Sequence, residues 1–177
     1  FLEMAIEECD RMTRLVGDLL VLSRLDNKKT SWKIETFDAE RFTEHIYNVM
    51  SVSAKERAQT LTMKCESDIP DVTADKEKLQ QVIINIVSNA IKYTPKGGNV
   101  AITAKNSGEF FLISVSDNGI GIPKDDLPRI FERFYRVEKS RTSDAGGTGL
   151  GLAIAKEIID AHGGITKINS AIGPGTK

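Results

Sequence analysis

The sequence predicts an α/β (α+β) two-layer sandwich. In this class, helices pack on one face of a mixed, mostly antiparallel sheet, and here one long amphipathic helix precedes it. Two observations indicate the class. Segments with helical apolar spacing are interleaved with short segments in which every second residue is apolar. Two of the short segments are joined by the turn Asn106-Ser107-Gly108, which is typical of an antiparallel hairpin.

Residues 1–25 predict the long amphipathic helix. A single helix cannot bury such a face, so we expect partner helices in a longer protein of which this chain is a fragment. A core helix of the main domain is the alternative, and the polar segment 26–30 that follows at once argues against it. The apolar residues follow the alternating three-and-four spacing of a bundle seam: Leu2, Ala5, Cys9, Met12, Val16 and Leu19.

Residues 32–93 predict three short strands and two helices. Strands are expected at 32–37, 61–65 and 72–74. Asp38 suits the N-cap of a helix that ends near Arg57, and Asp75 suits the N-cap of a strong helix that runs to about Tyr93.

The remaining chain predicts a hairpin followed by two further helices. The hairpin strands are expected at 100–104 and 110–116, a short helix at 125–135 and a polar loop at 137–147. A helix at 150–161 should end at His162-Gly163-Gly164, before a strand at 165–169. Gly173-Pro174-Gly175 turns toward a last strand, which we expect to be truncated at Lys177.

The composition excludes several classes of protein. Lys plus Arg is 24 and Asp plus Glu is 25, so no charge bias indicates nucleic acid or an anionic membrane as a partner. Two distant cysteines, Cys9 and Cys65, argue against a disulfide scaffold and a zinc site and favour a reducing cytoplasm. The apolar runs are far shorter than a membrane span.

The predicted helix after Asp75 carries the first candidate site. Asn85, Asn89 and Lys92 share the side opposite its apolar face, where a solvated helix would usually carry Lys, Glu and Gln. Two amide oxygens one turn apart suit Mg²⁺, and the ammonium suits a phosphate. Tyr93 could flank a ring or pack in the core. A solvated helix face is the alternative.

The segment Asp117-Asn118-Gly119-Ile120-Gly121-Ile122-Pro123 follows the predicted strand 110–116. An ionised Asp is only an acceptor, so Asp117 could take a hydrogen bond from an exocyclic amine such as adenine N6. Gly119 and Gly121 would let a ligand approach the backbone. An ordinary Asp-Asn-Gly turn is the alternative, which the second Gly and the Pro make less favourable.

The third candidate is Gly146-Gly147-Thr148-Gly149-Leu150-Gly151-Leu152, which opens a predicted helix and can offer backbone N–H groups to phosphate. The spacing and the preceding polar loop do not fit a dinucleotide-binding fold. A P-loop motif is missing from the sequence, and so are the His-Arg-Asp and Asp-Phe-Gly motifs of Ser/Thr/Tyr protein kinases.

The order of these motifs, with Phe131-Glu132-Arg133-Phe134-Tyr135-Arg136 between the last two, strongly resembles the catalytic and ATP-binding domain of bacterial sensor histidine kinases. These belong to the superfamily of gyrase B, Hsp90, histidine kinases and MutL. The chain looks closest to the WalK/YycG/VicK-like and PhoR-like groups. The resemblance implies two parts: 1–27, the last helix of a dimerisation and histidine-phosphotransfer domain, and 28–177, the catalytic and ATP-binding domain.

The resemblance also implies roles for individual residues. Asn85 and Asn89 would hold Mg²⁺ on the phosphates of ATP, with Lys92, Arg133 and Arg136 near those phosphates. Asp117 would bind the adenine amine. A lid at roughly 137–147 would close over the triphosphate. The other residues implied at the nucleotide are Tyr93, Gly119, Gly121, Ile122, Phe131, Phe134, Gly147, Thr148, Gly149, Leu150 and Gly151.

The acceptor motif of the family is missing, and neither His45 nor His162 has its sequence context. The resemblance therefore implies transfer of the γ-phosphate to a histidine on the dimerisation domain of the same protein, a homodimer in the parent. A response regulator receiver domain would take the phosphate next. The parent would be anchored in the cell membrane, with this part cytoplasmic.

Three alternatives stay open. An ATP hydrolase of the same superfamily would carry a Glu where this chain has Asn85, and an amide cannot act as a general base. A nucleotide-gated interaction module without catalysis would use helix 1–25 as a dimer seam. A serine kinase of the anti-sigma type would not need that helix.

Overall fold

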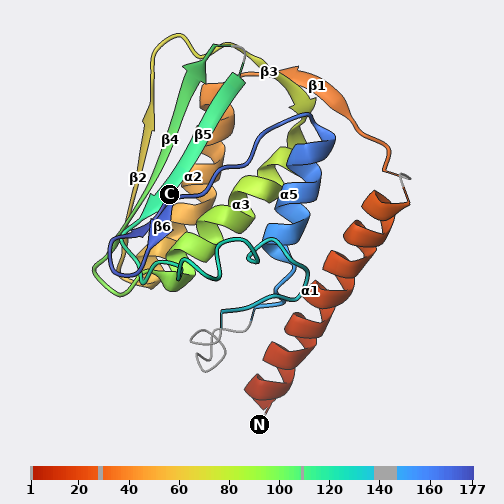
Figure 1. Ribbon diagram of the computed structural model, residues 1–177, viewed down its shortest axis with the longest axis vertical. Coiled ribbons are helices and arrows are strands. Elements are labelled where there is room, and N and C mark those ends of the chain that lie inside the picture. Colours follow the sequence, from red (N-terminus) through yellow and green to blue (C-terminus); the bar gives the residue numbers. More distant parts are fainter. Residues whose placement is uncertain (1, 28–29, 109, 138–146) are drawn as a thin grey trace.

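The computed structural model describes residues 2–27, 30–108, 110–137 and 147–177, without the side chains of residues 2–5 and 7 (Figure 1). The helices and strands follow one another along the chain as α1 (Leu2–Asp26), β1 (Ile34–Phe37), α2 (Ala39–Glu56), β2 (Thr60–Cys65), β3 (Val72–Asp75), α3 (Lys76–Tyr93), β4 (Asn99–Ser107), β5 (Phe110–Asp117), α5 (Gly151–Ala161), β6 (Ser170–Ala171) and β7 (Gly175–Thr176).

Five strands form the main sheet in the order β2-β4-β5-β7-β6. The β2–β4 pair is parallel, and the other neighbours are antiparallel. β1 and β3 form a separate antiparallel pair. Figure 1 shows α2 and α3 on one face of the main sheet, with α5 beside α3. The predicted sandwich with a mixed, mostly antiparallel sheet is therefore confirmed.

The core lies between these two layers. The inward face of β4, with Val100 and Ile102, packs in one apolar cluster with the inward faces of α3 and α5. Asp75 begins α3 as predicted, because its buried carboxylate accepts the Lys78 N–H at 3.0 Å and also the Lys33 N–H at 2.9 Å. The packing of α3 in the core and the cap at Asp75 together determine which side of α3 faces away from the sheet.

Helix α1 is only partly buried. Leu22 is 3% exposed and belongs to the core cluster. Met12, Val16, Leu19 and Leu20 are exposed. The described part of the predicted seam is thus exposed from Cys9 to Leu19, whereas the last two turns of the helix pack against the main domain. Among the described helices, none is both long enough and apolar enough to cross a membrane.

Two predicted elements are wrong. Residues 124–134 form consecutive turns instead of a helix. Several of their backbone hydrogen bonds join residues three apart, such as the Arg129 N–H and the Asp126 carbonyl oxygen. Pro128 has no N–H to donate within a helix, which explains the interruption. The predicted strand at 165–169 is not formed, because pairing with the chain near β7 begins only at Asn169, which exchanges two backbone hydrogen bonds with Lys177.

Candidate nucleotide-binding site

Helix α3 presents its polar side to the start of α5. The Asn85 Nδ2 donates a hydrogen bond to the carbonyl oxygen of Gly151, at 3.3 Å. Asn89, one turn later, is also half-buried. The Nζ of Lys92 lies 2.7 Å from the position that a Cβ on Gly147 would occupy. Two motifs about sixty residues apart therefore meet at one place.

Asp117 ends β5 beside the last turn of α3. Its Oδ1 accepts the Gly119 N–H at 2.8 Å, and the Ile120 N–H bonds to the Tyr93 carbonyl at 3.2 Å. A Cβ on Gly119 would lie 2.5 Å from that same carbonyl oxygen, so only glycine fits. Burial raises the pKa of Asp117, against the opposing effect of N–H donors from Gly119 and Thr176.

The C-terminal hairpin, formed by β6 and β7, contacts the segment that follows Asp117. Gly121 has a φ of +70°, and a Cβ there would lie 1.9 Å from the Ala171 carbonyl oxygen. The Ile122 N–H donates to the Ser170 hydroxyl at 2.9 Å. The close approach of Gly121 is therefore to the protein's own backbone. Sequence reasoning missed Ser170 and Ala171, which carry no local signal for this role.

The glycine-rich segment is held by Phe134 and by its own Thr. Gly149, at a φ of +73°, lies against the Phe134 backbone, and the Phe134 N–H donates to the Gly149 carbonyl at 3.0 Å. The Thr148 hydroxyl accepts the Leu150 N–H at 3.2 Å and donates to Asp18 of α1 at 2.9 Å. Leu150 is fully buried, which anchors the start of α5.

Between these two motifs, Arg133 is engaged in ion pairs with acidic side chains. Arg133 lies in a bidentate ion pair with Asp26, at 2.6 and 2.8 Å, and a second pair with Glu157, at 3.1 Å. These bonds raise the pKa of Arg133 and lower that of Asp26. Phe134 is 58% exposed at a φ of +64°, whereas Phe131 and Arg136 are half-buried. Residues 138–146 of the predicted lid lie outside the described chain.

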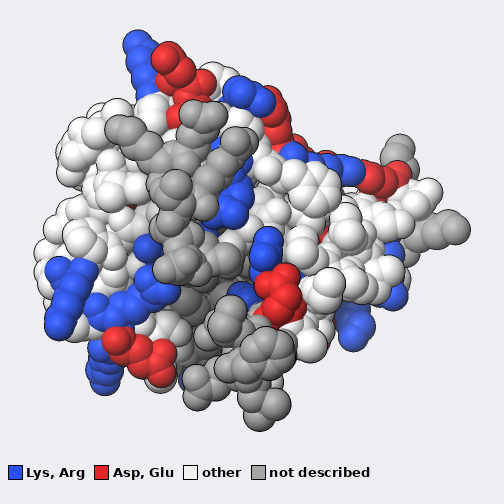
Figure 2. Space-filling view, turned by 90° about the horizontal axis from the view of Figure 1, so that it is seen from below, with Lys and Arg blue, Asp and Glu red and all other residues white. Residues whose placement is uncertain are grey.

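Basic and acidic side chains are interspersed over the end of the molecule seen in Figure 2. The described part of the chain holds no group of three His, Cys, Asp or Glu residues suited to a metal ion. Neutral amide oxygens can also serve as Mg²⁺ ligands, and α3 carries two amides one turn apart, Asn85 and Asn89. The Asn85 Nδ2 is already engaged with Gly151, and its amide oxygen takes no part in that bond.

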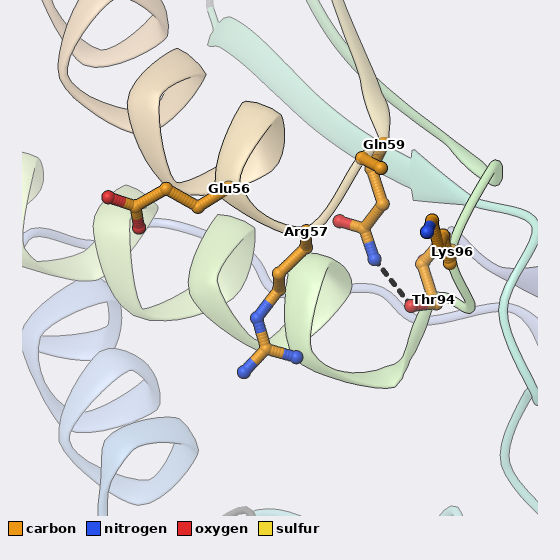
Figure 3. Close-up of a pocket in the computed structure, with 6 residues that line it drawn as sticks. Glu56, Arg57, Gln59, Thr94 and Lys96 are labelled. Carbon is orange, nitrogen blue, oxygen red and sulfur yellow. Dashed lines mark hydrogen bonds between the residues drawn. The ribbon is translucent and has the colours of Figure 1, made fainter.

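A separate cavity of about 360 Å³ lies where α2 and α3 end (Figure 3). None of the predicted site residues lines it. Gln59 crosses it and donates to the carbonyl oxygens of Ile91 and Thr94, tying the start of β2 to the end of α3. The lining residues are Glu56, Arg57, Ala58, Gln59, Thr94 and Lys96.

Comparison with known proteins agrees with this arrangement. Residues 74–177 match the family described as "Histidine kinase-, DNA gyrase B-, and HSP90-like ATPase". The chain therefore belongs to this ATPase family. Its sensor histidine kinase relatives confirm the sequence-based assignment to the histidine kinase branch.

The particular relatives are sensor kinases named WalK. The chain is 44% identical over 178 residues to the sensor histidine kinase WalK of Bacillus subtilis, covering 99% of this chain. It is 43% identical to a WalK of Staphylococcus aureus, again covering 99% of this chain. The chain spans 29% of the length of the Bacillus subtilis protein and 42% of that Staphylococcus aureus protein.

Solved structures show the same fold. Full-length ShkA in complex with AMPPNP superposes with a TM-score of 0.84 at 31% identity, covering 96% of this chain and 35% of that one. The nucleotide-free catalytic domain of histidine kinase ThkA superposes with a TM-score of 0.71 at 27% identity, covering 81% of this chain and 91% of that one.

Proposed function

We propose that this chain is the catalytic part of a two-component sensor kinase that binds Mg-ATP. It would transfer the γ-phosphate to a histidine on a bundle helix outside the chain. The observation that carries the proposal is the meeting of α3 with the glycine-rich segment, where Asn85 contacts Gly151 and Lys92 lies beside Gly147. An ammonium, amide oxygens and backbone N–H groups together suit a triphosphate.

Each part of the nucleotide would have its own partner. The Asp117 carboxylate would accept a hydrogen bond from the adenine amine, beside Tyr93 and the wall formed by Gly119, Gly121 and Ile122. Lys92 and Arg136 would orient the phosphates. Arg133 would join them only after leaving Asp26 and Glu157. Mg²⁺ on Asn85 and Asn89 would neutralise charge on the phosphates.

The transfer itself needs little from this chain beyond positioning. A neutral imidazole nitrogen of the acceptor would form the bond to the γ-phosphorus while the bond to the β-γ bridging oxygen breaks, leaving ADP. The imidazole proton would pass to solvent. Hydrolysis would be slow, because Asn85 occupies the place of a water-activating Glu and its amide cannot accept a proton.

We assign residues 1–27 to the last helix of the dimerisation and histidine-phosphotransfer domain and residues 28–177 to the catalytic domain. The exposed seam of α1 supports this division, since it leaves apolar side chains such as Met12 and Val16 for partner helices. A response regulator receiver domain would accept the phosphate next. The full protein would be anchored in the cell membrane, with this part in the cytoplasm.

A titration with an ATP analogue, with and without Mg²⁺, tests the proposal. Mg²⁺ should strengthen binding, and Asn89→Ala should remove most of that gain while leaving adenosine binding unchanged. Ser88→Ala, on the exposed side of the same helix, is the matched control and should behave as the unaltered chain. Absence of ATP binding at millimolar concentration, or an undiminished effect of Mg²⁺ on Asn89→Ala, would refute the assignment.

A further inference from the structure

The cavity where α2 and α3 end carries two basic side chains at its rim. Arg57, which follows α2, and Lys96, which follows α3, are both exposed and both line the cavity. Within the part of the chain that the structure describes, neither has an ion-pair partner. Figure 3 shows the Glu56 side chain extending away from the other residues that line the cavity. The rim therefore offers two cations to an anionic group.

The floor of the cavity, formed by the buried residues Gln59 and Thr94, carries two oxygen atoms without a partner. The Gln59 Nε2 donates to the carbonyl oxygens of Ile91 and Thr94, which fixes the orientation of the amide. Gln59 is 7% exposed and Thr94 is 4% exposed. The Gln59 Oε1 and the Thr94 Oγ1 are buried and have no hydrogen-bond partner among the described residues. Buried polar atoms almost always have a partner, so these two oxygens indicate a group that is held in the cavity.

The chemistry of the rim and the floor defines the ligand. The Arg57 guanidinium and the Lys96 ammonium favour a carboxylate, which a planar guanidinium can bind through two hydrogen bonds. The Gln59 Oε1 is only an acceptor, so the ligand must bring an O–H or N–H donor, whereas the Thr94 hydroxyl can donate or accept. Figure 3 shows Gln59 and Thr94 between Arg57 and Lys96. The volume of about 360 Å³ is near the lower end of the range of roughly 300–1,000 Å³ for ligand sites, so a small molecule fits.

We propose that this cavity is a ligand site, separate from the nucleotide site, for a small carboxylate that carries a hydroxyl or amino group. The carboxylate would lie between Arg57 and Lys96, and the hydroxyl or amino group would donate to the Gln59 Oε1. None of the residues assigned to the nucleotide lines the cavity, so the inference does not rest on the function proposed above. Bound ligand would join the segment after α2 to the segment after α3 and so stabilise the fold.

The experiment is a titration of the whole chain with L-malate, compared with succinate at equal ionic strength. Succinate has the same two carboxylates and lacks the hydroxyl, so it should bind roughly tenfold more weakly, within the range for one hydrogen bond to a buried acceptor. Malate should shift the backbone amide resonances of Gln59, Thr94 and Lys96 and leave those of Asn89 and Gly151 in place. It should also raise the melting temperature of the chain.

Three variants and a matched control locate the site. Arg57→Gln and Lys96→Gln should each weaken malate binding by about fivefold, because each removes a charged hydrogen-bond donor. Lys64→Gln removes the same charge from an exposed position on β2, outside the cavity, and should leave the affinity unchanged. Thr94→Val should weaken malate binding without lowering the melting temperature of the free chain, because the hydroxyl that it removes has no described partner to lose.

Several results would overturn the inference. They are the absence of malate binding at millimolar concentration, equal binding of succinate, and affinities of Arg57→Gln and Lys96→Gln that match that of Lys64→Gln. Displacement of malate by an ATP analogue, with shifts at Asn89 and Gly151, would place the carboxylate in the nucleotide site and would also overturn it. A chain that binds malate and not ATP would refute the proposed function and support this site.

Discussion

Asp117, which we propose to contact the adenine, is held by the fold in a position that disfavours its charge. Its carboxylate is half-buried at the end of β5 and accepts the Gly119 N–H at 2.8 Å. Burial nevertheless raises its pKa, so ionisation is disfavoured relative to an exposed Asp. A ligand that brings a further hydrogen-bond donor would offset this effect, as the proposed function requires.

We predict that the chain binds ATP more tightly than GTP. Guanine presents a carbonyl oxygen where adenine has its amine, and the Asp117 carboxylate would repel it. The unsatisfied pair should cost about 1–3 kcal/mol, or roughly 5- to 150-fold in affinity. Competition between the two nucleotides measures this. Asp117→Asn should lose most of the selectivity, and Asp125→Asn, at an exposed position, should retain it. Equal affinities in the unaltered chain would contradict the prediction.

The raised pKa of Asp117 predicts that acidification has opposite effects on ATP binding and on the stability of the fold. Acidification should weaken ATP binding, beginning above the ordinary Asp value of about 3.9, because the protonated acid is no longer an acceptor-only group. Stability should change in the other direction. Because the pKa of Asp117 is higher in the folded chain than in the unfolded chain, protonation of Asp117 stabilises the folded chain. This stabilisation is complete below about pH 3.9 and is lost as the pH rises through the pKa of the folded state.

The measurement for this prediction is the ratio of ATP affinities of the unaltered chain and Asp117→Asn across pH 4–7, since the ratio removes protonation of ATP itself. The ratio should fall toward one on acidification. A ratio independent of pH would show that Asp117 does not face the nucleotide. Unfolding curves at each pH identify any loss of binding that comes from unfolding.

At the scale of helices and strands, the two Asp N-caps differ in what they hold. Asp38 caps α2 through the Arg41 N–H and is exposed, whereas Asp75 is 4% exposed and joins α3 to the residue before β1 through Lys33. The Asp75 N–H also donates to His162 Nε2 at the end of α5. Asp75 thus joins three segments of the chain. The residues around Asp75 resemble those around Asp38, so this difference is not visible in the local sequence.

We predict that Asp75→Ala destabilises the chain more than Asp38→Ala. Loss of an exposed cap costs about 0.5–1 kcal/mol. Asp75→Ala removes the cap bond to the Lys78 N–H and also leaves the partly buried hydrogen bond of the Lys33 N–H without its acceptor, so about 2–3 kcal/mol is expected. Urea unfolding of the two variants measures the difference in free energy of unfolding. Equal losses would mean that burial of Asp75 adds nothing to the cap.

At the scale of the whole molecule, the described histidines are poorly placed to accept phosphate. His162 Nε2 accepts the Asp75 N–H at 3.1 Å, and its Nδ1 lies 2.8 Å from the Ile158 carbonyl oxygen. His45 lies on α2, beside Gln80. Neither imidazole adjoins Lys92 or the glycine-rich segment, where the γ-phosphate would be delivered. His162 is the C-cap of α5, so the predicted end of this helix at His162-Gly163-Gly164 is confirmed.

We predict that the chain binds ATP without labelling itself. A histidine outside attack distance lacks the rate advantage of a positioned acceptor, which lowers the barrier by up to about 7–11 kcal/mol. Incubation with γ-labelled ATP and Mg²⁺ should leave the chain unlabelled and release phosphate slowly. A separate helical hairpin that carries the acceptor histidine should gain a weak, acid-labile label. Acid-stable label on the chain itself would indicate a serine kinase, and fast phosphate release would indicate a hydrolase.

Local patterns were sufficient for the sandwich class, for both Asp caps and for most helices and strands, since apolar periodicity and capping act over a few residues. They failed at 124–134, where Pro128 breaks a helical apolar pattern, and at 165–169, where the chain pairs with the following strand only from Asn169 onward. The family assignment was confirmed because it rests on the order of several motifs.

The sequence by itself determined the candidate residues, because a row of Asn and Lys on a helix and glycines at fixed spacing are local facts. Only the tertiary structure decided what each residue contacts. It placed Asn85 against Gly151, gave Gly121 to the C-terminal hairpin, and turned Arg133 toward Asp26 and Glu157. The physical reason is that hydrogen bonds and ion pairs form between groups close in space, and those groups lie up to about a hundred residues apart along this chain.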